Sequence, residues 1–103
     1  MTTLSTHVLD TSSGEPASGM VVRLARWDDG WVGVAESTTD EDGRVSGFGE
    51  LDEGRFRLGF ETGAYGNDFY PFIHVEFTID GDRPHYHLPL LLSPYGYSTY
   101  RGS

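Results

Sequence analysis

Apolar and polar residues alternate one by one along several short stretches of this chain. The clearest stretch is residues 54–61, where Phe56, Leu58 and Phe60 alternate with arginine and glycine. Successive side chains of a β-strand point to opposite faces, so this alternation predicts a strand with one face in a core. Similar patterns or short apolar runs predict further strands over residues 4–10, 20–27, 31–37, 71–79, 88–92 and 97–101.

Residues that favour turns separate these stretches. Asp28-Asp29-Gly30 is typical of a β-hairpin turn. Ser93-Pro94-Tyr95-Gly96 places proline second and glycine fourth, as a type I turn prefers. Turns recur about every eight to twelve residues, and no stretch has the periodicity of an amphipathic helix. The chain therefore predicts a single domain over residues 1–103, an all-β fold built as an antiparallel β-sandwich of seven to eight strands.

Counting outward from the last turn assigns the two faces of the last hairpin. If Ser93 pairs with Gly96, His87 lies opposite Gly102, and directly opposed residues share a face. One face is expected in the core and carries Tyr86, Leu88, Leu90, Leu92 and Tyr97. The other face mixes imidazole, hydroxyl, phenol and apolar groups and carries His85, His87, Pro89, Leu91, Ser98 and Tyr100. Contact with solvent alone does not require this mixture, so we expect the second face to line a subunit interface or a cleft.

The charge balance excludes several kinds of partner. The chain has no lysine, and its seven arginines stand against 16 acidic residues, for a formal net charge of −9. Such a surface repels nucleic acid and anionic membranes, so we expect neither as a partner. The absence of cysteine excludes disulfide bonds and thiolate catalysis. No apolar run approaches the length of a membrane span and no secretory signal is visible at residues 1–10, so we expect a cytoplasmic location.

Histidines are the candidates for acid–base chemistry. His7 and His87 each lie on the strand face opposite the expected core residues, beside an apolar side chain. An imidazole in such surroundings can act as acid, base or ligand, although an interface hydrogen bond is an alternative role for either. His85 shares a face with His87 and could orient it. His74 lies on the polar side of its strand beside Glu76, and we expect it to be exposed and structural.

Two other kinds of catalysis receive less support. His7, His85 and His87 resemble a three-histidine zinc site. No carboxylate has an evident place beside them as a hydrogen-bond partner, so we expect no metal and no cofactor. Serine-nucleophile chemistry is not indicated, because the chain has no Gly-x-Ser-x-Gly sequence. Ser103 suits hydrogen bonding to water or substrate better than covalent attack, since a terminal residue frays unless it is tied down.

Two stretches carry a family resemblance. They are His7-Val8-Leu9-Asp10 followed by Gly14-x-Pro16, and Tyr86-His87-Leu88-Pro89 through Ser93-Pro94-Tyr95 to Tyr100-Arg101-Gly102-Ser103. Both resemble the 5-hydroxyisourate hydrolases, the transthyretin-related enzymes of urate catabolism, and Asp40-x-Asp42-Gly43-Arg44 also fits. The terminal Tyr-Arg-Gly-Ser is the most specific mark, since the hormone carrier transthyretin lacks it. The Ser-Pro-Tyr hairpin is shared with transthyretin and indicates the fold alone.

The resemblance implies a transthyretin-like fold and a homotetramer, with active sites at the dimer–dimer interface, at the two ends of a central channel. It places the catalytic residues at His7, Arg44, His87 and Ser103. It places substrate binding at His7, Arg44, Tyr100 and Arg101. Relatives carry a short helix after the segment that ends at Tyr65, but only Gly66-Asn67-Asp68 follows here before the next aromatic residues. We therefore expect this helix to be trimmed or absent.

The implied reaction is hydrolysis of 5-hydroxyisourate to 2-oxo-4-hydroxy-4-carboxy-5-ureidoimidazoline. One of His7 and His87 would activate water, with a slight preference for His7, and the other would orient water or substrate. Arg44 would stabilise the developing negative charge, which its forked guanidinium suits well. The alternatives are a non-catalytic small-molecule carrier that uses the same channel, a metal-dependent hydrolase, and a structural or adhesion module.

Overall fold

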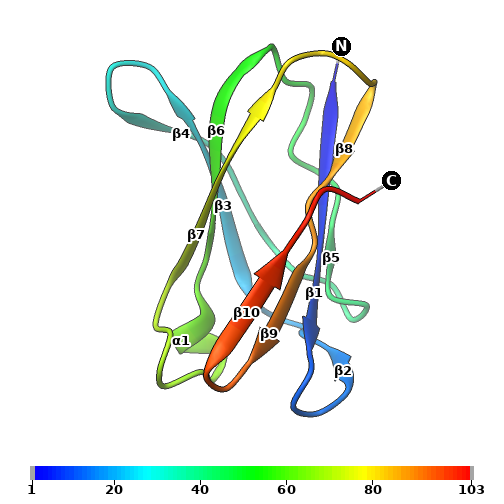
Figure 1. The fold of residues 1–103 in the computed structure, drawn as a ribbon, viewed down its shortest axis with the longest axis vertical. Helices are drawn as coiled ribbons and strands as arrows, with labels where there is room; N and C mark the ends of the chain where they lie inside the picture. The colour runs from blue at the N-terminus through cyan, green and yellow to red at the C-terminus, as the bar shows by residue number, and fades with distance from the viewer. Residues whose placement is uncertain (1, 103) are drawn as a thin grey trace.

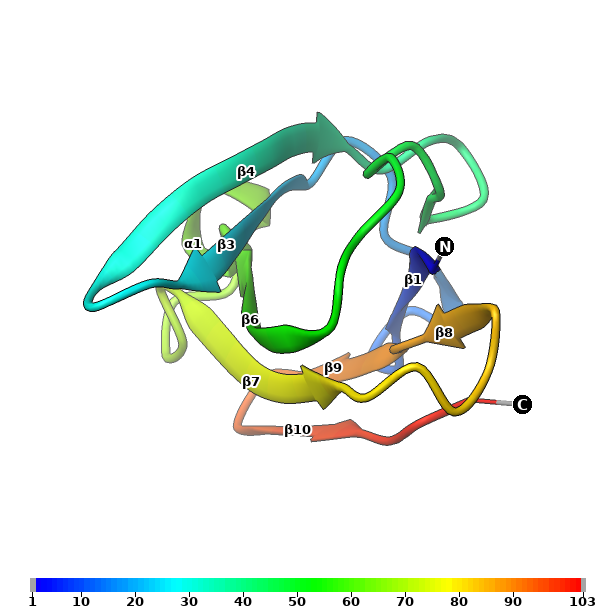
Figure 2. The same ribbon diagram turned by 90° about the horizontal axis from the view of Figure 1, so that it is seen from above.

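Two β-sheets packed face to face form the protein. The computed structural model describes residues 2–102 of the chain. One sheet has the order β4-β3-β6-β7, and all of its pairs are antiparallel (Figure 1). Its strands are β3 Val21–Trp27, β4 Trp31–Thr38, β6 Gly54–Phe60 and β7 Ile73–Ile79. Figure 2 shows this sheet as one layer, with β8, β9 and β10 in the layer opposite.

The second sheet is organised around β1, Thr3–Asp10. Its other strands are β2 Glu15–Pro16, β5 Arg44–Val45, β8 His85–His87, β9 Leu90–Ser93 and β10 Gly96–Thr99. β1 pairs antiparallel with β2 and β5 but parallel with β8 and β9. The predicted all-β sandwich is confirmed, with this parallel pairing as the exception to an antiparallel arrangement. Residues 2–102 form ten strands. Eight remain when the two-residue strands β2 and β5 are not counted, against the seven to eight predicted.

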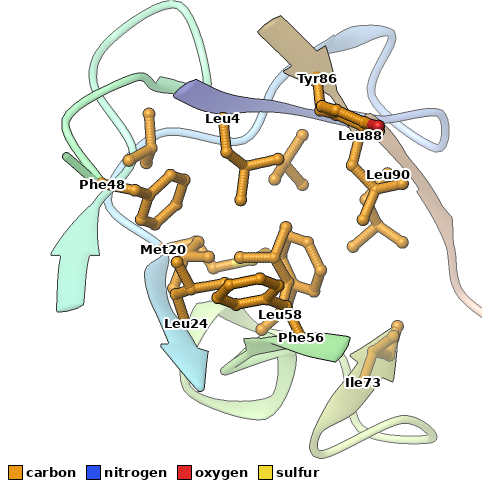
Figure 3. Packing of buried hydrophobic residues seen from close by; sticks show 14 of the residues in the cluster. Leu4, Met20, Leu24, Phe48, Phe56, Leu58, Ile73, Tyr86, Leu88 and Leu90 are labelled. Carbon is orange, nitrogen blue, oxygen red and sulfur yellow. The ribbon is translucent and has the colours of Figure 1, made fainter. Parts of the chain in front are cut away.

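Alternating side chains from both sheets fill the space between them. Phe56, Leu58 and Phe60 of β6 are all buried, as their spacing predicted. Figure 3 shows Leu4 and Leu90 of one sheet facing residues of the other across this core. Removing such apolar surface from water, at about 25 cal/mol per Å², is the dominant favourable contribution to folding.

The register predicted for the last hairpin is confirmed. Ser93 pairs with Gly96, and His87 forms a bridge with Gly102. The expected core residues before the turn are buried, namely Tyr86, Leu88, Leu90 and Leu92. Tyr97 is the exception, with 44% of its surface exposed. It belongs to the edge strand β10, where its ring packs edge-on against Tyr70.

Pro89 also departs from the predicted alternation. We expected it on the open face with His87, but it is buried. It lies between the end of β8 and the start of β9, where the regular strand is interrupted. A proline has no N–H to donate to a β-ladder, so the strand breaks there and strict alternation is lost.

The expected trimming of the helix is confirmed. α1 comprises only Thr62–Tyr65, a single turn. Asn67 joins the following loop to the hairpin: its side-chain oxygen accepts the N–H groups of Phe69 and Tyr70, and its amide donates to the Ser93 carbonyl. In residues 2–102 there is no helix with the length and apolar character that crossing a membrane requires.

Candidate active site

The side of β1 that points away from the core brings the predicted site residues together. Ser5 and His7 lie on this side, while Thr6 between them is fully buried. His7 is paired with Arg44 of β5, and Ser5 is paired with His87 of β8. Residues paired across neighbouring strands share a face. Two histidines and an arginine from three distant segments therefore lie on one outward face of the sheet.

Arg44 is positioned by the acidic turn that precedes it. The Asp40 carboxylate accepts the backbone N–H groups of Asp42 and Arg44, both at 2.9 Å. Gly43 has φ of +75°, and its carbonyl accepts the N–H of Val8 at 2.8 Å. A Cβ on Gly43 would lie 2.5 Å from the Val8 carbonyl oxygen. Only glycine therefore allows this close approach, which places Arg44 beside β1.

His87 is held from two sides. The Ser5 hydroxyl lies 2.8 Å from His87 Nδ1. On the other side, the Gly102 N–H donates to the His87 carbonyl at 2.7 Å. A Cβ on Gly102 would lie 2.7 Å from Cδ2 of His87, so the ring packs against this backbone. The segment at Gly102 thus runs directly beside the candidate catalytic imidazole. In Figure 1 the red part of the chain that follows β10 passes close to β8.

His85 extends the contacts of Ser5. His85 Nε2 lies 2.8 Å from the Ser5 hydroxyl, which is also the partner of His87. The other ring nitrogen of His85, Nδ1, lies 2.6 Å from the Thr3 hydroxyl. The four side chains therefore form one continuous chain of hydrogen-bonding groups, from exposed Thr3 and His85 to partly buried His87.

The surroundings of His87 favour its neutral form. Burial lowers the pKa of His87, because the charged imidazolium loses hydration. The positive charges of Arg44, His7 and His85 lower the pKa further, in that order. A neutral imidazole can accept a proton, so at neutral pH His87 is in the form that a general base requires.

The residues of the terminal signature, Tyr-Arg-Gly-Ser, differ in their exposure and contacts. Tyr100 is 56% exposed. Arg101 donates to the Asp82 carboxylate at 3.2 Å, and its guanidinium stands 5.5 Å from the centre of the Tyr86 ring. Its charge is therefore engaged at the connection between β7 and β8. Ser103 lies outside the described residues, and its role stays a prediction.

Comparison with known proteins identifies the family. Residues 4–102 match the model of the HIUase/Transthyretin family. The chain belongs to this family. A mouse 5-hydroxyisourate hydrolase is 42% identical over 111 residues, which cover 97% of this chain and 94% of the mouse protein.

Solved structures place two kinds of family member on the same fold. The structure of Klebsiella pneumoniae 5-hydroxyisourate hydrolase is 40% identical, with a TM-score of 0.87 and full coverage of both chains. Sea bream transthyretin in complex with thyroxine has the same TM-score at 31% identity, covering 96% of this chain and 93% of the carrier. Because the backbone resembles both equally, the choice between family activities rests on the side chains of the site.

Sequence reasoning missed the two hydroxyls of this site. Ser5 and Thr3 were not among the predicted residues, although Ser5 shares the His7 face of β1. Their importance depends on the parallel pairing of β1 with β8, in which Ser5 lies beside His87. No local pattern indicates which strand lies beside β1.

The contacts of the histidines also bear on metal binding. Within residues 2–102, no group of three or more His, Cys, Asp or Glu side chains is arranged to hold a metal ion. Both ring nitrogens of His85 lie within hydrogen-bond distance of hydroxyls. Coordination of a metal by His85 would have to break one of these contacts.

Proposed function

We propose that this protein hydrolyses 5-hydroxyisourate to 2-oxo-4-hydroxy-4-carboxy-5-ureidoimidazoline. The observation that carries the proposal is the convergence of His7, Arg44 and His87 on one face of a sheet. Relatives at 40% and 42% identity over nearly the whole chain are named for this hydrolysis, which supports the assignment. The site offers a base, a positive group and a second imidazole, which hydrolysis of a cyclic amide requires.

His87 is assigned as the general base. It takes a proton from water, and the water oxygen attacks the ring acyl carbon to form a tetrahedral intermediate. The C–N bond then breaks, and the leaving nitrogen receives a proton. The lowered pKa of His87 keeps its imidazole neutral before attack, and the Ser5 hydroxyl beside Nδ1 orients its ring. The sequence slightly preferred His7 for this role. His7 then orients the water or the substrate.

Arg44 stabilises the oxyanion of the intermediate. It is paired with His7 on the neighbouring strand and is held by the turn at Asp40. Its side chain is exposed in the single protomer, so a ligand can reach the guanidinium. An arginine there both attracts negative charge and keeps His87 deprotonated, and these two effects act in the same direction for hydrolysis.

The complete site requires further copies of the chain. His7 and His87 are only partly buried in the described protomer, and Arg44 is exposed. Hydrolytic chemistry of this kind is stronger where bulk water is excluded. A homotetramer, with this face turned toward a second dimer, supplies the missing wall.

Following the decay of 5-hydroxyisourate tests the proposed function. The compound is generated in the cuvette from urate, and its absorbance is followed with and without the protein. The protein is expected to accelerate the decay in proportion to its concentration. The His74→Ala variant is the control, because His74 is exposed on the other sheet, and it should act like the parent protein. An unchanged decay rate would reject the hydrolase assignment.

A small-molecule carrier is the second candidate. The similarity to sea bream transthyretin in complex with thyroxine favours it. It predicts saturable binding of an aromatic ligand without turnover. Binding that persists in a variant lacking His7, together with no effect on 5-hydroxyisourate, would support the carrier.

A further inference from the structure

A single hydroxyl group links two histidine rings. The Ser5 oxygen lies 2.8 Å from His85 Nε2 and 2.8 Å from His87 Nδ1. A serine hydroxyl has one proton to donate. When that proton lies between the rings, Ser5 donates to one ring and accepts from the other, so that one of these two nitrogens is protonated and the other is not. The tautomers of His85 and His87 are coupled through Ser5.

The coupling allows two arrangements of protons. In the first, Ser5 donates to His87 Nδ1, His85 Nε2–H donates to Ser5, and Thr3 donates to His85 Nδ1. His87 then carries its proton on Nε2. In the second, all three hydrogen bonds run the other way, and His87 Nε2 is bare. The direction of the chain thus determines whether His87 Nε2 is a donor or a base.

We propose that Thr3, His85, Ser5 and His87 form a proton relay, in which His85 is a positioning residue that sets the tautomer of His87 and accepts its surplus proton. This inference rests on the proposed hydrolysis. It gives functions to Ser5 and His85, which lie beside the proposed catalytic residues in the pairing of β1 with β8.

The relay can carry the proton that is released when water attacks the substrate. In the second arrangement, bare Nε2 of His87 takes a proton from the attacking water. The Nδ1 proton of His87 passes to Ser5 Oγ, and the Ser5 proton passes to His85 Nε2. The positive charge has then moved to His85, and His87 is neutral with a proton on Nε2. From this state Nε2–H can donate to the leaving nitrogen, and the proton returns along the chain.

The electrostatics favour transfer in this direction. His87 is partly buried and has Arg44 on β5 and His7 on β1 as positive neighbours, besides His85 on its own strand. A second positive charge on His87 is therefore unfavourable. His85 is exposed, so a proton on its ring is hydrated. The relay moves charge from a site that repels it to one that water stabilises.

Three variants distinguish a proton relay from hydrogen bonds that only stabilise the structure. Ser5→Ala removes the linking hydroxyl, whereas Ser5→Thr retains it. His85→Gln keeps a hydrogen-bonding side chain at an exposed position but cannot carry a proton. We expect Ser5→Ala and His85→Gln to lower kcat about tenfold or more, a part of the usual contribution of acid–base catalysis, with KM nearly unchanged. Ser5→Thr should retain most of the parent kcat, as should the control variant His74→Gln.

A spectroscopic signature completes the test. The ¹⁵N chemical shifts of the His87 ring report which nitrogen is protonated, and they do not depend on turnover. We expect them to change in His85→Gln and in Ser5→Ala but not in Ser5→Thr. Unchanged kcat and unchanged His87 shifts in His85→Gln would overturn the relay. Altered shifts in a protein that never hydrolyses 5-hydroxyisourate would reject the proposed function but support the coupling. If Ser5→Ala does not fold, His85→Gln decides.

Discussion

His87 and His74 share the direction of their pKa shift but differ in their neighbours. Burial and a nearby arginine lower the pKa of His74 as well, with Arg57 in the role that Arg44 has for His87. His74, however, is exposed on the outer face of the other sheet, beside Phe72. A shifted pKa alone therefore does not identify a catalytic residue in this protein. The hydroxyl on Nδ1 of His87 and the face that it shares with His7 distinguish the candidate site.

Replacing either site histidine should remove most of the activity. We expect His7→Ala and His87→Ala each to lower kcat about 10²–10⁴-fold, the usual contribution of a general base or acid. Each variant shortens one side chain outside the core, so the fold should survive, and we expect the assembly to survive as well. Steady-state kinetics with light scattering checks both points. Retention of most turnover by both variants would contradict the assignment.

The acid side of the pH profile should follow His87. Because the pKa of His87 is lowered in the folded protein, the unfolded chain binds a proton there at higher pH than the folded chain does. Activity should therefore persist below the ordinary histidine pKa of about 6.5. Stability contributed by this group should be present above that pH and be lost as the pH falls through the folded value. An NMR titration of the ring gives the pKa directly, and replacing Arg44 by Gln should raise it.

At the scale of elements, local patterns predicted the strands, whereas long-range pairing determined the site. The alternation of Phe56, Leu58 and Phe60 was sufficient to predict β6, because a repeat of every second residue is typical of a strand with one buried face. The turn at Ser93 was sufficient to predict how β9 pairs with β10. Nothing local indicated that Ser5 would lie beside His87, 82 residues away, in a parallel pairing. The strand faces singled out His7 and His87, whereas Arg44 and the terminal residues came from family resemblance. The linking hydroxyls became evident only with the pairing.

Gly43 offers a test of how the acidic turn positions Arg44. Gly43→Ala would add a Cβ 2.5 Å from the Val8 carbonyl at φ of +75°. We expect it to lower the free energy of unfolding by about 2–4 kcal/mol and to reduce kcat. Chemical denaturation and kinetics measure the two effects.

Gly14 supplies the matched control for this test. It has φ of +76°, but a Cβ there would meet nothing within 4 Å. Gly14→Ala should therefore cost only the backbone strain, about 1 kcal/mol, and leave kcat unchanged. Equal losses in the two variants would show that contact with β1 is not what Gly43 provides.

At the scale of the whole molecule, Arg44 places a positive charge on the candidate face of an acidic protein. The formal charge is −9, and the seven arginines are the only permanently positive side chains. Arg44, beside His7 on the neighbouring strand, provides positive potential where the proposed oxyanion forms. The same fold carries thyroxine in a transthyretin structure of equal TM-score, so this local charge, and not the sandwich, supports hydrolysis.

Removing residues 100–103 tests the terminal signature. The His87 carbonyl would lose the N–H of Gly102, and the ring would lose the backbone that packs against it. Most core residues lie elsewhere, so the truncated chain should fold. We expect little hydrolysis from it, measured by the decay of 5-hydroxyisourate, with circular dichroism as the control for folding. Full activity after truncation would show that this segment is not part of the site.

The parallel pairing of β1 with β8 also imposes an order of events during synthesis. β3, β4, β6 and β7 are neighbours in a sheet that needs nothing beyond residue 79. β1 is made before this sheet, yet its partners β8 and β9, at residues 85–93, are made only after it. Until then its edge is available to other chains, which is a known hazard for slowly paired strands. A nascent chain halted before residue 85 could therefore complete one sheet, but it would lack His87 of the candidate site, and β1 would be paired only with β2 and β5.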